Sequence, residues 1–210
     1  MQIEYFGHSC FRLTTDSGIQ ILTDPYTAVG YEMPKGIHAD IVTVSHEHFD
    51  HNHIAGVLGA FSVVRGTGAT DCLGVKFEGI STFHDAACGA LRGKNTVYKI
   101  TADDMTICHL GDIGEPCNEA LVQSLGKVDV LLVPVGGTYT IDEKGAWEYV
   151  RAIAPSTVIP MHYLPSDGRL DIADEQAFLD GISYLTCSEA YIPKRENNLQ
   201  VVFMRRKECV

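Results

Sequence analysis

Short hydrophobic runs with a period of two residues dominate the first half of the chain, and turn-forming residues separate them. Such runs predict strands, because alternate side chains of a strand point to opposite faces. The first three runs follow one another closely, across turns such as Asp16-Ser17-Gly18, which predicts an antiparallel meander. The strands expected in this half span residues 2–6, 10–14, 19–22, 41–44, 61–64, 75–83, 97–100 and 106–109.

Helical periodicity becomes clear only in the second half, where it alternates with further β-rich runs. The order of strand, helix, strand, helix and strand is typical of a mixed sheet with helices outside it. We therefore expect an α/β protein with two packed sheets flanked by helices. The helices expected here span residues 118–125, 142–154 and 174–181, and the strands 128–133, 157–159 and 199–204.

Length and composition narrow the class of protein. The 210 residues are 45% hydrophobic and 20% charged, which is ordinary for a globular chain. No repeat or linker interrupts the pattern, so residues 1–210 are expected to form a single domain. The net charge of -11 opposes nucleic acid as a partner, because phosphates are neutralised by basic surfaces. The densest basic run, residues 205–207, is expected to be a solvated tail.

The cysteines and the N-terminus bear on the compartment. Seven cysteines occur with no CxxC pair, and an odd number cannot all pair within one chain. A reducing cytoplasm is therefore the expected location. The first residues lack the features of a signal peptide, and no apolar run is long enough to span a bilayer. We expect no membrane partner.

The strongest chemical signal is the motif H-x-H-x-D-H, formed by His46, His48, Asp50 and His51 immediately after the strand at residues 41–44. In an extended segment residues i and i+2 point the same way, so the first two histidines can bind one ion. A following turn can direct the other two residues to a second position. Imidazole and carboxylate are zinc ligands. The alternative is a run of solvated surface histidines.

Three more residues of ligand type each follow an apolar, β-rich stretch: His84, Asp112 and His162. Strand ends converge at one edge of a sheet, where sites of α/β proteins are assembled. Taken singly, each residue is more often a satisfied structural group than a ligand. Together with the histidine motif they predict a metal site.

This order of motifs resembles the metallo-β-lactamase superfamily across essentially the whole chain. The resemblance implies a four-layer αββα sandwich. More narrowly, the chain looks like uncharacterised metal-dependent hydrolases and L-ascorbate-6-phosphate lactonases, a match that names no substrate. The motifs that carry it are Gly7-His8-Ser9, Thr23-Asp24-Pro25, His109-Leu110-Gly111-Asp112, residues 132–140 and residues 158–163.

The resemblance also implies roles for the ligand-type residues. The first metal would be held by His46, His48 and His84, and the second by Asp50, His51 and His162, with Asp112 bridging them. Zinc is the expected metal, two ions per chain, with manganese or iron as alternatives. A water shared by the two ions would lose a proton and attack the substrate, which makes Asp50 and Asp112 the catalytic carboxylates. Asp112 replaces the cysteine that some lactamases use, which argues against antibiotic hydrolysis.

The leading functional hypothesis is a hydrolase of a small ester, lactone or phosphodiester with an anionic substrate. An iron-dependent redox enzyme of the same fold is the first alternative, but such flavoproteins carry Glu where His48 stands and an added flavin domain. A nucleic-acid-processing hydrolase is opposed by the acidic charge. A non-catalytic binding module is opposed by the complete ligand set. The oligomeric state stays open.

Other residues near these motifs have less certain roles. Asp24 is expected to accept the free N–H of a ligand imidazole, and His8 to lie near the site or to cap a turn. His53 and His109 are expected to be spectators or outer donors, and His38 to be a surface residue.

Residues later in the chain leave similar alternatives open. Gly136 and Gly137 could offer backbone N–H groups to a substrate or simply form a tight turn. Tyr163, beside a predicted ligand, is a candidate for substrate contact. Trp147 and Tyr149 are expected to pack in the core or along the helix surface.

Overall fold

The first third of the chain forms a five-stranded sheet in the computed structural model, which describes residues 1–207. The strands lie in sequence order, and the first three form the antiparallel meander expected from the turns. The last two run parallel to their neighbours, which brings their carboxyl ends to the same edge. The strands are β1 (Gln2–Gly7), β2 (Cys10–Thr14), β3 (Gln20–Thr23), β4 (Ile41–Val44) and β5 (Ser62–Arg65).

The second sheet has eight strands in the order β12-β13-β11-β10-β9-β8-β7-β6. Strands β6 to β9 are antiparallel hairpin neighbours, whereas β9, β10, β11, β13 and β12 are parallel. Their bounds are β6 (Gly68–Cys72), β7 (Val75–Phe83), β8 (Lys94–Ala102), β9 (Met105–His109), β10 (Val130–Pro134), β11 (Thr157–Met161), β12 (Leu185–Cys187) and β13 (Gln200–Met204).

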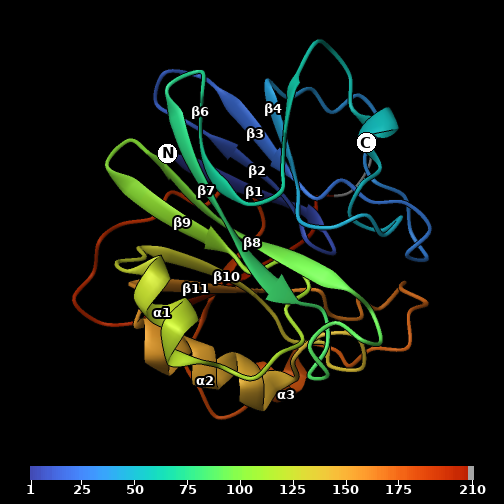
Figure 1. Ribbon diagram of the computed structural model, residues 1–210, viewed down its shortest axis with the longest axis vertical. Coiled ribbons are helices and arrows are strands. Elements are labelled where there is room, and N and C mark those ends of the chain that lie inside the picture. The colour runs from blue at the N-terminus through green and yellow to red at the C-terminus, as the bar shows by residue number, and fades with distance from the viewer. Residues whose placement is uncertain (208–210) are drawn as a thin grey trace.

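Three α-helices, α1 (Glu119–Leu125), α2 (Glu143–Ile153) and α3 (Gln176–Leu179), pack together on the outer side of the second sheet (Figure 1). The side chain of Asn118 accepts the N–H of Leu121, and that of Asp142 accepts the N–H of Gly145. Such caps satisfy donors that have no partner within the helix, which fixes where α1 and α2 begin.

The main core lies between the two sheets and continues beneath the helices. Alternation along β1 shows how one strand serves two layers: Ile3 and Tyr5 face this core, whereas Phe6 faces the opposite side. There Phe6 is covered by loop residues such as Tyr26 and Met33. The layer outside the first sheet is therefore built from loops and the short 3-10 helix η1 (Ile54–Gly56), in place of α-helices.

Most of the elements expected from the sequence are present. The α/β class and the two packed sheets are confirmed. Strands β6 and β12 were not predicted, because most of their residues are exposed and give no hydrophobic alternation. Helix α3 is shorter than expected, and its N-cap residue Glu175 makes no side-chain capping hydrogen bond.

The prediction of a solvated C-terminal tail is wrong for Arg206 and Lys207, although Arg205 is exposed. Arg206 pairs with Asp167 and stacks on Tyr31, 4.0 Å from the ring centre, and Lys207 pairs with Glu4.

Among residues 1–207, no helix is both long and apolar enough to cross a membrane. Six cysteines are unpaired, while the seventh, Cys209, lies outside the described residues.

Candidate metal centre

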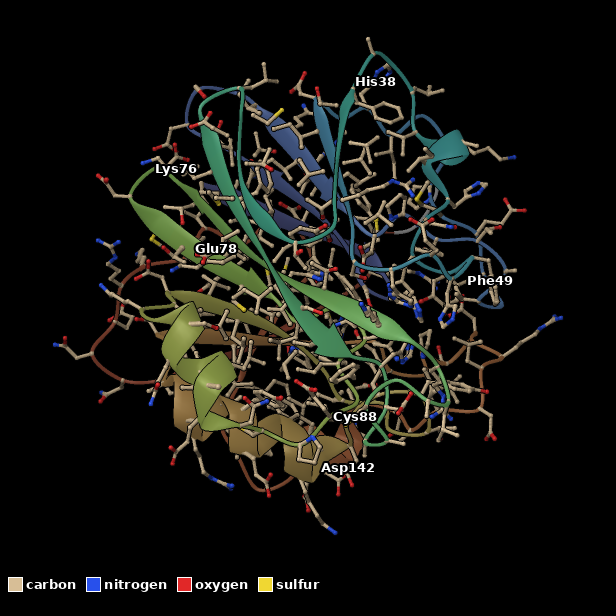
Figure 2. All side chains as sticks on the ribbon, in the orientation of Figure 1. His38, Phe49, Lys76, Glu78, Cys88 and Asp142 are labelled. Carbon is tan, nitrogen blue, oxygen red and sulfur yellow. The ribbon has the colours of Figure 1, made fainter. Side chains whose placement is uncertain are left out.

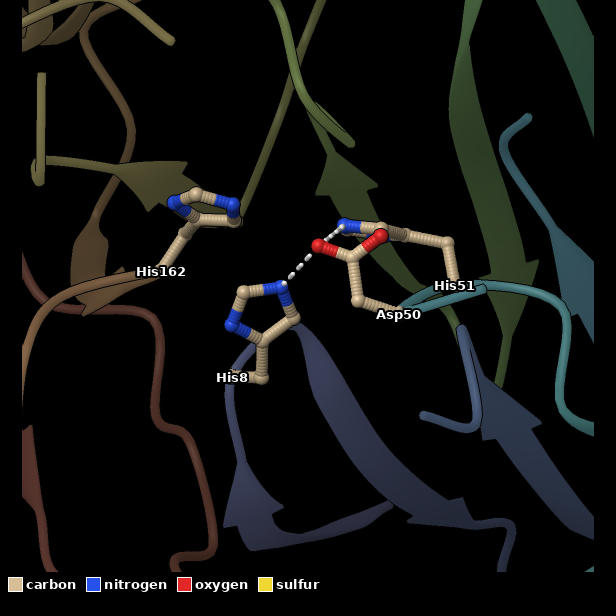
Figure 3. Close-up of side chains that lie close together, drawn as sticks. All are labelled: His8, Asp50, His51 and His162. Atoms are coloured by element: carbon tan, nitrogen blue, oxygen red, sulfur yellow. Dashed lines mark hydrogen bonds and ion pairs between the residues drawn. The ribbon is translucent and has the colours of Figure 1, made fainter. Parts of the chain in front are cut away.

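The ligand-type residues meet at the edge where strands of both sheets end. His8 follows β1, Asp24 follows β3, and the histidine motif follows β4 in the first sheet. His84 and His162 follow β7 and β11 of the second sheet, and Asp112 lies three residues beyond β9. Figure 3 shows four side chains from three of these segments turned toward one another: His8, Asp50, His51 and His162.

The segment after β4 is a bend followed by a turn, and the extended conformation predicted for it is wrong. The N–H groups of His51 and Asn52 both donate to the carbonyl of His48, at 3.0 and 3.1 Å. The bend nevertheless brings His46 Nε2 within 3.0 Å of His48 Nδ1. The two imidazoles therefore lie together as predicted, although the backbone is bent, and their binding of one ion stays a prediction.

Four imidazoles converge on one carboxylate oxygen, Oδ2 of Asp112. The Nε2 atoms of His51, His84 and His162 lie 3.1, 3.2 and 3.2 Å from it, and Nε2 of His46 lies at 3.9 Å. All seven residues predicted as ligands belong to three overlapping clusters of possible metal-ligand atoms. These clusters are His46-His48-His84, His8-Asp50-His51-His162 and His46-His51-Asp112.

The buried side chain of Asn95 holds the backbone of Asp112 in place. Its Oδ1 accepts the Asp112 N–H at 3.0 Å, and its Nδ2 donates to the carbonyl of Leu110 at 2.9 Å. Gly111 between them has a φ of +55°, and a Cβ there would lie 2.4 Å from Asn95 Oδ1. Glycine is therefore required for Asp112 to reach the centre.

Asp24 holds two of the histidines from behind, one directly and one through Ser45. The sequence predicted such a contact with one ligand imidazole. Its Oδ2 lies 2.8 Å from His51 Nδ1 and accepts the Ser45 hydroxyl at 2.5 Å. Since that hydroxyl donates to Asp24, it accepts from Nδ1 of His46, at 3.0 Å. Both imidazoles are thus fixed through Nδ1, which leaves Nε2 facing the centre.

His84 is anchored in the same way by a backbone group. Its Nδ1 lies 3.0 Å from the carbonyl of Tyr139, which can only accept, so Nδ1 carries the proton. Tyr139 lies in the loop after β10, within residues 132–140, where the sequence suggested a role only for the neighbouring glycines. The N–H of Gly137 is already used by the carbonyl of Ile141, so the proposed role in binding substrate does not apply to it.

Burial and charge oppose each other strongly in this centre. Burial alone would raise the pKa of Asp112, but the charges of His162 and His51 outweigh it and hold that pKa well below its usual range. Burial likewise lowers the pKa of His51, yet Asp112 and Asp24 reverse the effect and raise it. The pKa of His46 falls to about 3, mainly through burial and then through the charge of His51. The carboxylates thus remain ionised and require positive charge beside them.

His8 is the residue whose part in the site the sequence left open. It is fully buried, and Nε2 of its ring lies 3.1 Å from Oδ2 of Asp50 (Figure 3). Burial, followed by the nearby charge of His162, lowers its pKa to about 4, so the ring is neutral at pH 7. Because the Asp50 carboxylate can only accept, Nε2 of His8 donates to it and orients it. The feature of the sequence that pointed to this residue was the position of Gly7-His8 at a tight hairpin turn.

The remaining histidines lie outside the clusters. His109 is fully buried, with Nε2 donating to the carbonyl of Ser9 at 2.8 Å, so it links β9 to the β1–β2 hairpin. His53 precedes η1 and joins none of the metal-type clusters. His38 is exposed and lies at the top of the view in Figure 2, away from Phe49, which is part of the histidine motif.

The predictions for three aromatic residues are partly confirmed and partly wrong. Tyr163 is buried in the core and its hydroxyl donates to the carbonyl of Met204, so the predicted substrate contact is wrong. Tyr149 is fully buried, and Trp147 stacks on Phe178 with ring centres 4.7 Å apart. Both residues pack in or against the core, as expected.

A cavity of about 340 Å³ opens onto the centre. His48 lies at its exposed side, and Phe49, 54% exposed, forms part of the rim. This volume admits a small molecule and excludes a folded macromolecule. The lining residues are His48, Phe49, Asp50, His84, Arg92, Asp112, Tyr139 and Leu170.

The donor set fits a metal ion better than it fits hydrogen bonding alone. Nε2 of His51 and Oδ1 of Asp112 are buried and have no hydrogen-bond partner among the described residues. Buried polar atoms without partners are costly, and a cation that accepts both lone pairs removes that cost. Neutral imidazoles and carboxylates in this number are the donors that zinc and similar ions bind.

The fold and this centre together define a metal-dependent hydrolase of the metallo-β-lactamase superfamily. More particularly, the chain belongs to the family described as the beta-lactamase superfamily domain, whose model matches residues 2–162.

Relatives named for metal-dependent activity share most of the chain. A UPF0173 metal-dependent hydrolase from Methanoculleus marisnigri is 31% identical over 188 residues, covering 78% of this chain and 81% of the relative. Another from Thermoplasma acidophilum is 28% identical over 203 residues, covering 85% and 89%. A solved structure from Thermotoga maritima, suggested to be a zinc-dependent hydrolase of the superfamily, is 36% identical with a TM-score of 0.81, covering 97% of both chains.

Proposed function

We propose that the chain forms one enzyme domain that binds two zinc ions and hydrolyses a small ester, lactone or phosphodiester. His46, His48 and His84 would hold the first ion, and Asp50, His51 and His162 the second, with Asp112 between them. Manganese or iron in place of zinc would change the metal and leave this ligand assignment intact.

The observation that carries the proposal is the convergence on Asp112. Three Nε2 atoms lie within 3.2 Å of its Oδ2, while separate acceptors engage the far nitrogens of His51 and His84. Seven ligand-type side chains exceed what one tetrahedral ion can use, which supports two positions. Zinc is favoured by the predominance of imidazole nitrogen over oxygen.

When bound, the ions supply Lewis acidity to the scissile group and lower the pKa of a shared water. The protein holds their ligands at fixed directions: Asp24 through Nδ1 of His51, Tyr139 through Nδ1 of His84, and His8 through Asp50. Substrate would enter from the side of His48. No serine or cysteine nucleophile is then needed.

The substrate is proposed to be a small anionic molecule, in keeping with the cavity volume of about 340 Å³. The net charge of -11 weighs against a nucleic-acid substrate. Unpaired cysteines at six described positions suit a reducing compartment, so the proposal extends to a cytoplasmic enzyme.

Metal analysis and a substrate panel test the proposal together. Purified protein is reconstituted with excess zinc, its metal content is measured, and lactones, phosphodiesters, esters and thioesters are assayed. We expect about two ions per chain and zinc-dependent hydrolysis of at least one class. One tightly held ion, unchanged by excess zinc, would contradict the bridged centre, and tightly bound iron with redox colour would favour the redox alternative.

The variants His48→Ala and His38→Ala form a matched pair for this test. His48 lies 3.0 Å from the ring nitrogen of His46, whereas His38 is exposed and outside every cluster. The first variant should lose metal and activity, and the second should keep both. Equal effects would refute the ligand assignment.

A further inference from the structure

Arg92 is the one positively charged residue, histidines aside, among those lining the cavity beside the centre. It also lines a neighbouring hollow formed by residues of β4, the histidine motif and β8. The residue is half-buried, and its neighbours in the cavity include the predicted metal ligands His48 and His84. Its place in a protein with a net charge of -11 calls for an explanation.

The loop that carries Arg92 is held rigidly by Asp85. The carboxylate of Asp85 accepts the backbone N–H groups of Ala87, Gly89, Leu91 and Arg92 at 2.8 to 3.1 Å. The loop then returns to its start, because the N–H of His84 donates to the carbonyl of Gly93. The backbone of Arg92 is thereby fixed beside a predicted metal ligand.

The guanidinium of Arg92 has no ion-pair partner among residues 1–207. Its Cζ instead lies 5.4 Å from the centre of the Tyr139 ring. The nearby Arg65 differs, since it pairs with Glu47. A stacked guanidinium keeps its charge and its N–H donors available, and its planar fork matches a carboxylate or a phosphate.

Tyr139 connects this cation to the centre. Its carbonyl accepts the Nδ1 proton of His84 at 3.0 Å, while its ring supports Arg92. One residue therefore sets the position of the guanidinium relative to a metal ligand. Phe49 and Leu170 contribute apolar walls to the same cavity, which reduces solvent screening around a bound anion.

We propose that Arg92 binds an anionic oxygen group of the substrate, a carboxylate or a phosphate, and so determines specificity for substrates that carry negative charge away from the scissile bond. This inference rests on the proposed hydrolytic function and adds to it a recognition residue. The bound anion accepts from the guanidinium fork while the scissile group faces the centre.

The test compares two aryl esters on zinc-loaded enzyme: p-nitrophenyl acetate, which is neutral, and mono-p-nitrophenyl glutarate, which carries a carboxylate. The wild type should prefer the glutarate ester in kcat/KM. Arg92→Gln should lose about ten-fold to a hundred-fold of that preference, mainly through KM, because a charge-assisted hydrogen bond is removed. Arg92→Lys should restore part of it. Arg151→Gln, on the exposed end of α2, is the matched control and should leave both esters unchanged.

Binding measurements separate this inference from the proposed function. Calorimetry on zinc-loaded protein compares glutarate with neutral glutaramide, so the Arg92 contribution is measured even if neither ester is hydrolysed. If all substrates fail but Arg92→Gln weakens glutarate binding at least ten-fold, the anion site stands and the hydrolase proposal fails. If hydrolysis occurs but the Arg92→Gln variant hydrolyses both esters and binds both ligands as the wild type does, the anion site is refuted.

Discussion

At the scale of single residues, the orientation of each imidazole depends on the atom behind it. Asp24 and Tyr139 engage Nδ1 of His51 and His84, and in each ring Nε2 then faces Asp112. The free energy of metal binding depends on this fixed orientation as much as on the ligands themselves.

The variant Asp24→Asn should lower zinc affinity by about ten-fold to a hundred-fold, as is typical when an outer partner of a ligand is changed. An uncharged asparagine amide accepts from His51 and Ser45 more weakly than the carboxylate does. The imidazoles of His51 and His46 are therefore held less firmly through their Nδ1 atoms. Competitive zinc titration with a chromophoric chelator measures the effect. Asp71→Asn, on exposed strand β6, should leave affinity unchanged.

The variant Asp112→Ala should damage catalysis more than folding. Without the carboxylate the four imidazoles lose their common centre, and misplacement of reacting groups by about 1 Å can cost roughly a hundred-fold in rate. Turnover should fall at least that far, with zinc content reduced.

Asp142→Ala is the control for that experiment, since Asp142 caps α2 and lies outside the centre. It should cost on the order of 1 kcal/mol of unfolding free energy and leave turnover intact. Should Asp112→Ala behave like this control, with a lowered thermal midpoint but full metal and a normal rate, the bridging role is wrong.

At the scale of elements, strand ends explain both the success and the gaps of sequence reasoning. Buried strands such as β4 and β11 were predictable from their apolar runs, and the ligands that follow them could be inferred to converge. The parts of Asn95 and Tyr139 could not, because one acts from within a strand and the other through its backbone carbonyl. Arg92 was missed because a lone arginine has no periodic signal.

Asp129 connects strand ends that lie away from the centre, and its contacts lead to a prediction about these elements. Its carboxylate accepts the N–H of Thr106 at 2.9 Å and the Nε–H of Arg195 at 2.9 Å. Burial tends to raise its pKa, but Arg195 and the Thr106 N–H outweigh it, so the folded-state pKa is lowered. The resulting stability is present above the unfolded pKa of about 3.9 and is lost as the pH falls through the folded value.

Asp129→Asn should therefore lower the unfolding free energy by about 1–3 kcal/mol at pH 7 and by less at pH 3. Urea unfolding of metal-free wild type and variant at both pH values gives the two differences. A deficit that is equal at both pH values would show that the ionised carboxylate is not what stabilises these strands.

At the scale of the whole molecule, the centre joins the two sheets. The histidine motif and Asp24 belong to the first sheet, whereas His84, Asp112 and His162 belong to the second. Ligands from both sheets imply that bound metal stabilises their packing. Saturating zinc at a hundred times its Kd should add about 2.7 kcal/mol to the unfolding free energy. Calorimetry with and without a chelator checks this.

The same centre predicts how zinc binding depends on pH. Burial lowers the pKa values of His51 and His84, but Asp112 outweighs it and both are raised, so these rings keep their protons to a higher pH than a free imidazole does, and zinc competes with those protons. In the metal-free protein their stabilising effect is present below the unfolded pKa of about 6.5 and is lost as the pH rises through the folded values. Zinc affinity should therefore increase with pH, with proton release measured by calorimetry in buffers of different ionisation enthalpy.

The unequal exposure of the two proposed ion positions bears on the kinetics of metal exchange. The cluster of His46, His48 and His84 includes an exposed ring, whereas the other cluster has three buried rings, those of His8, His51 and His162, beside the half-buried carboxylate of Asp50. A chelator can approach the exposed ring of the first position directly, whereas displacing the buried rings of the second position requires the protein to open locally. The first ion should therefore leave and return faster than the second. Timed chelation followed by addition of a different metal would then yield an enzyme with two different ions, one of them spectroscopically visible, in a known order.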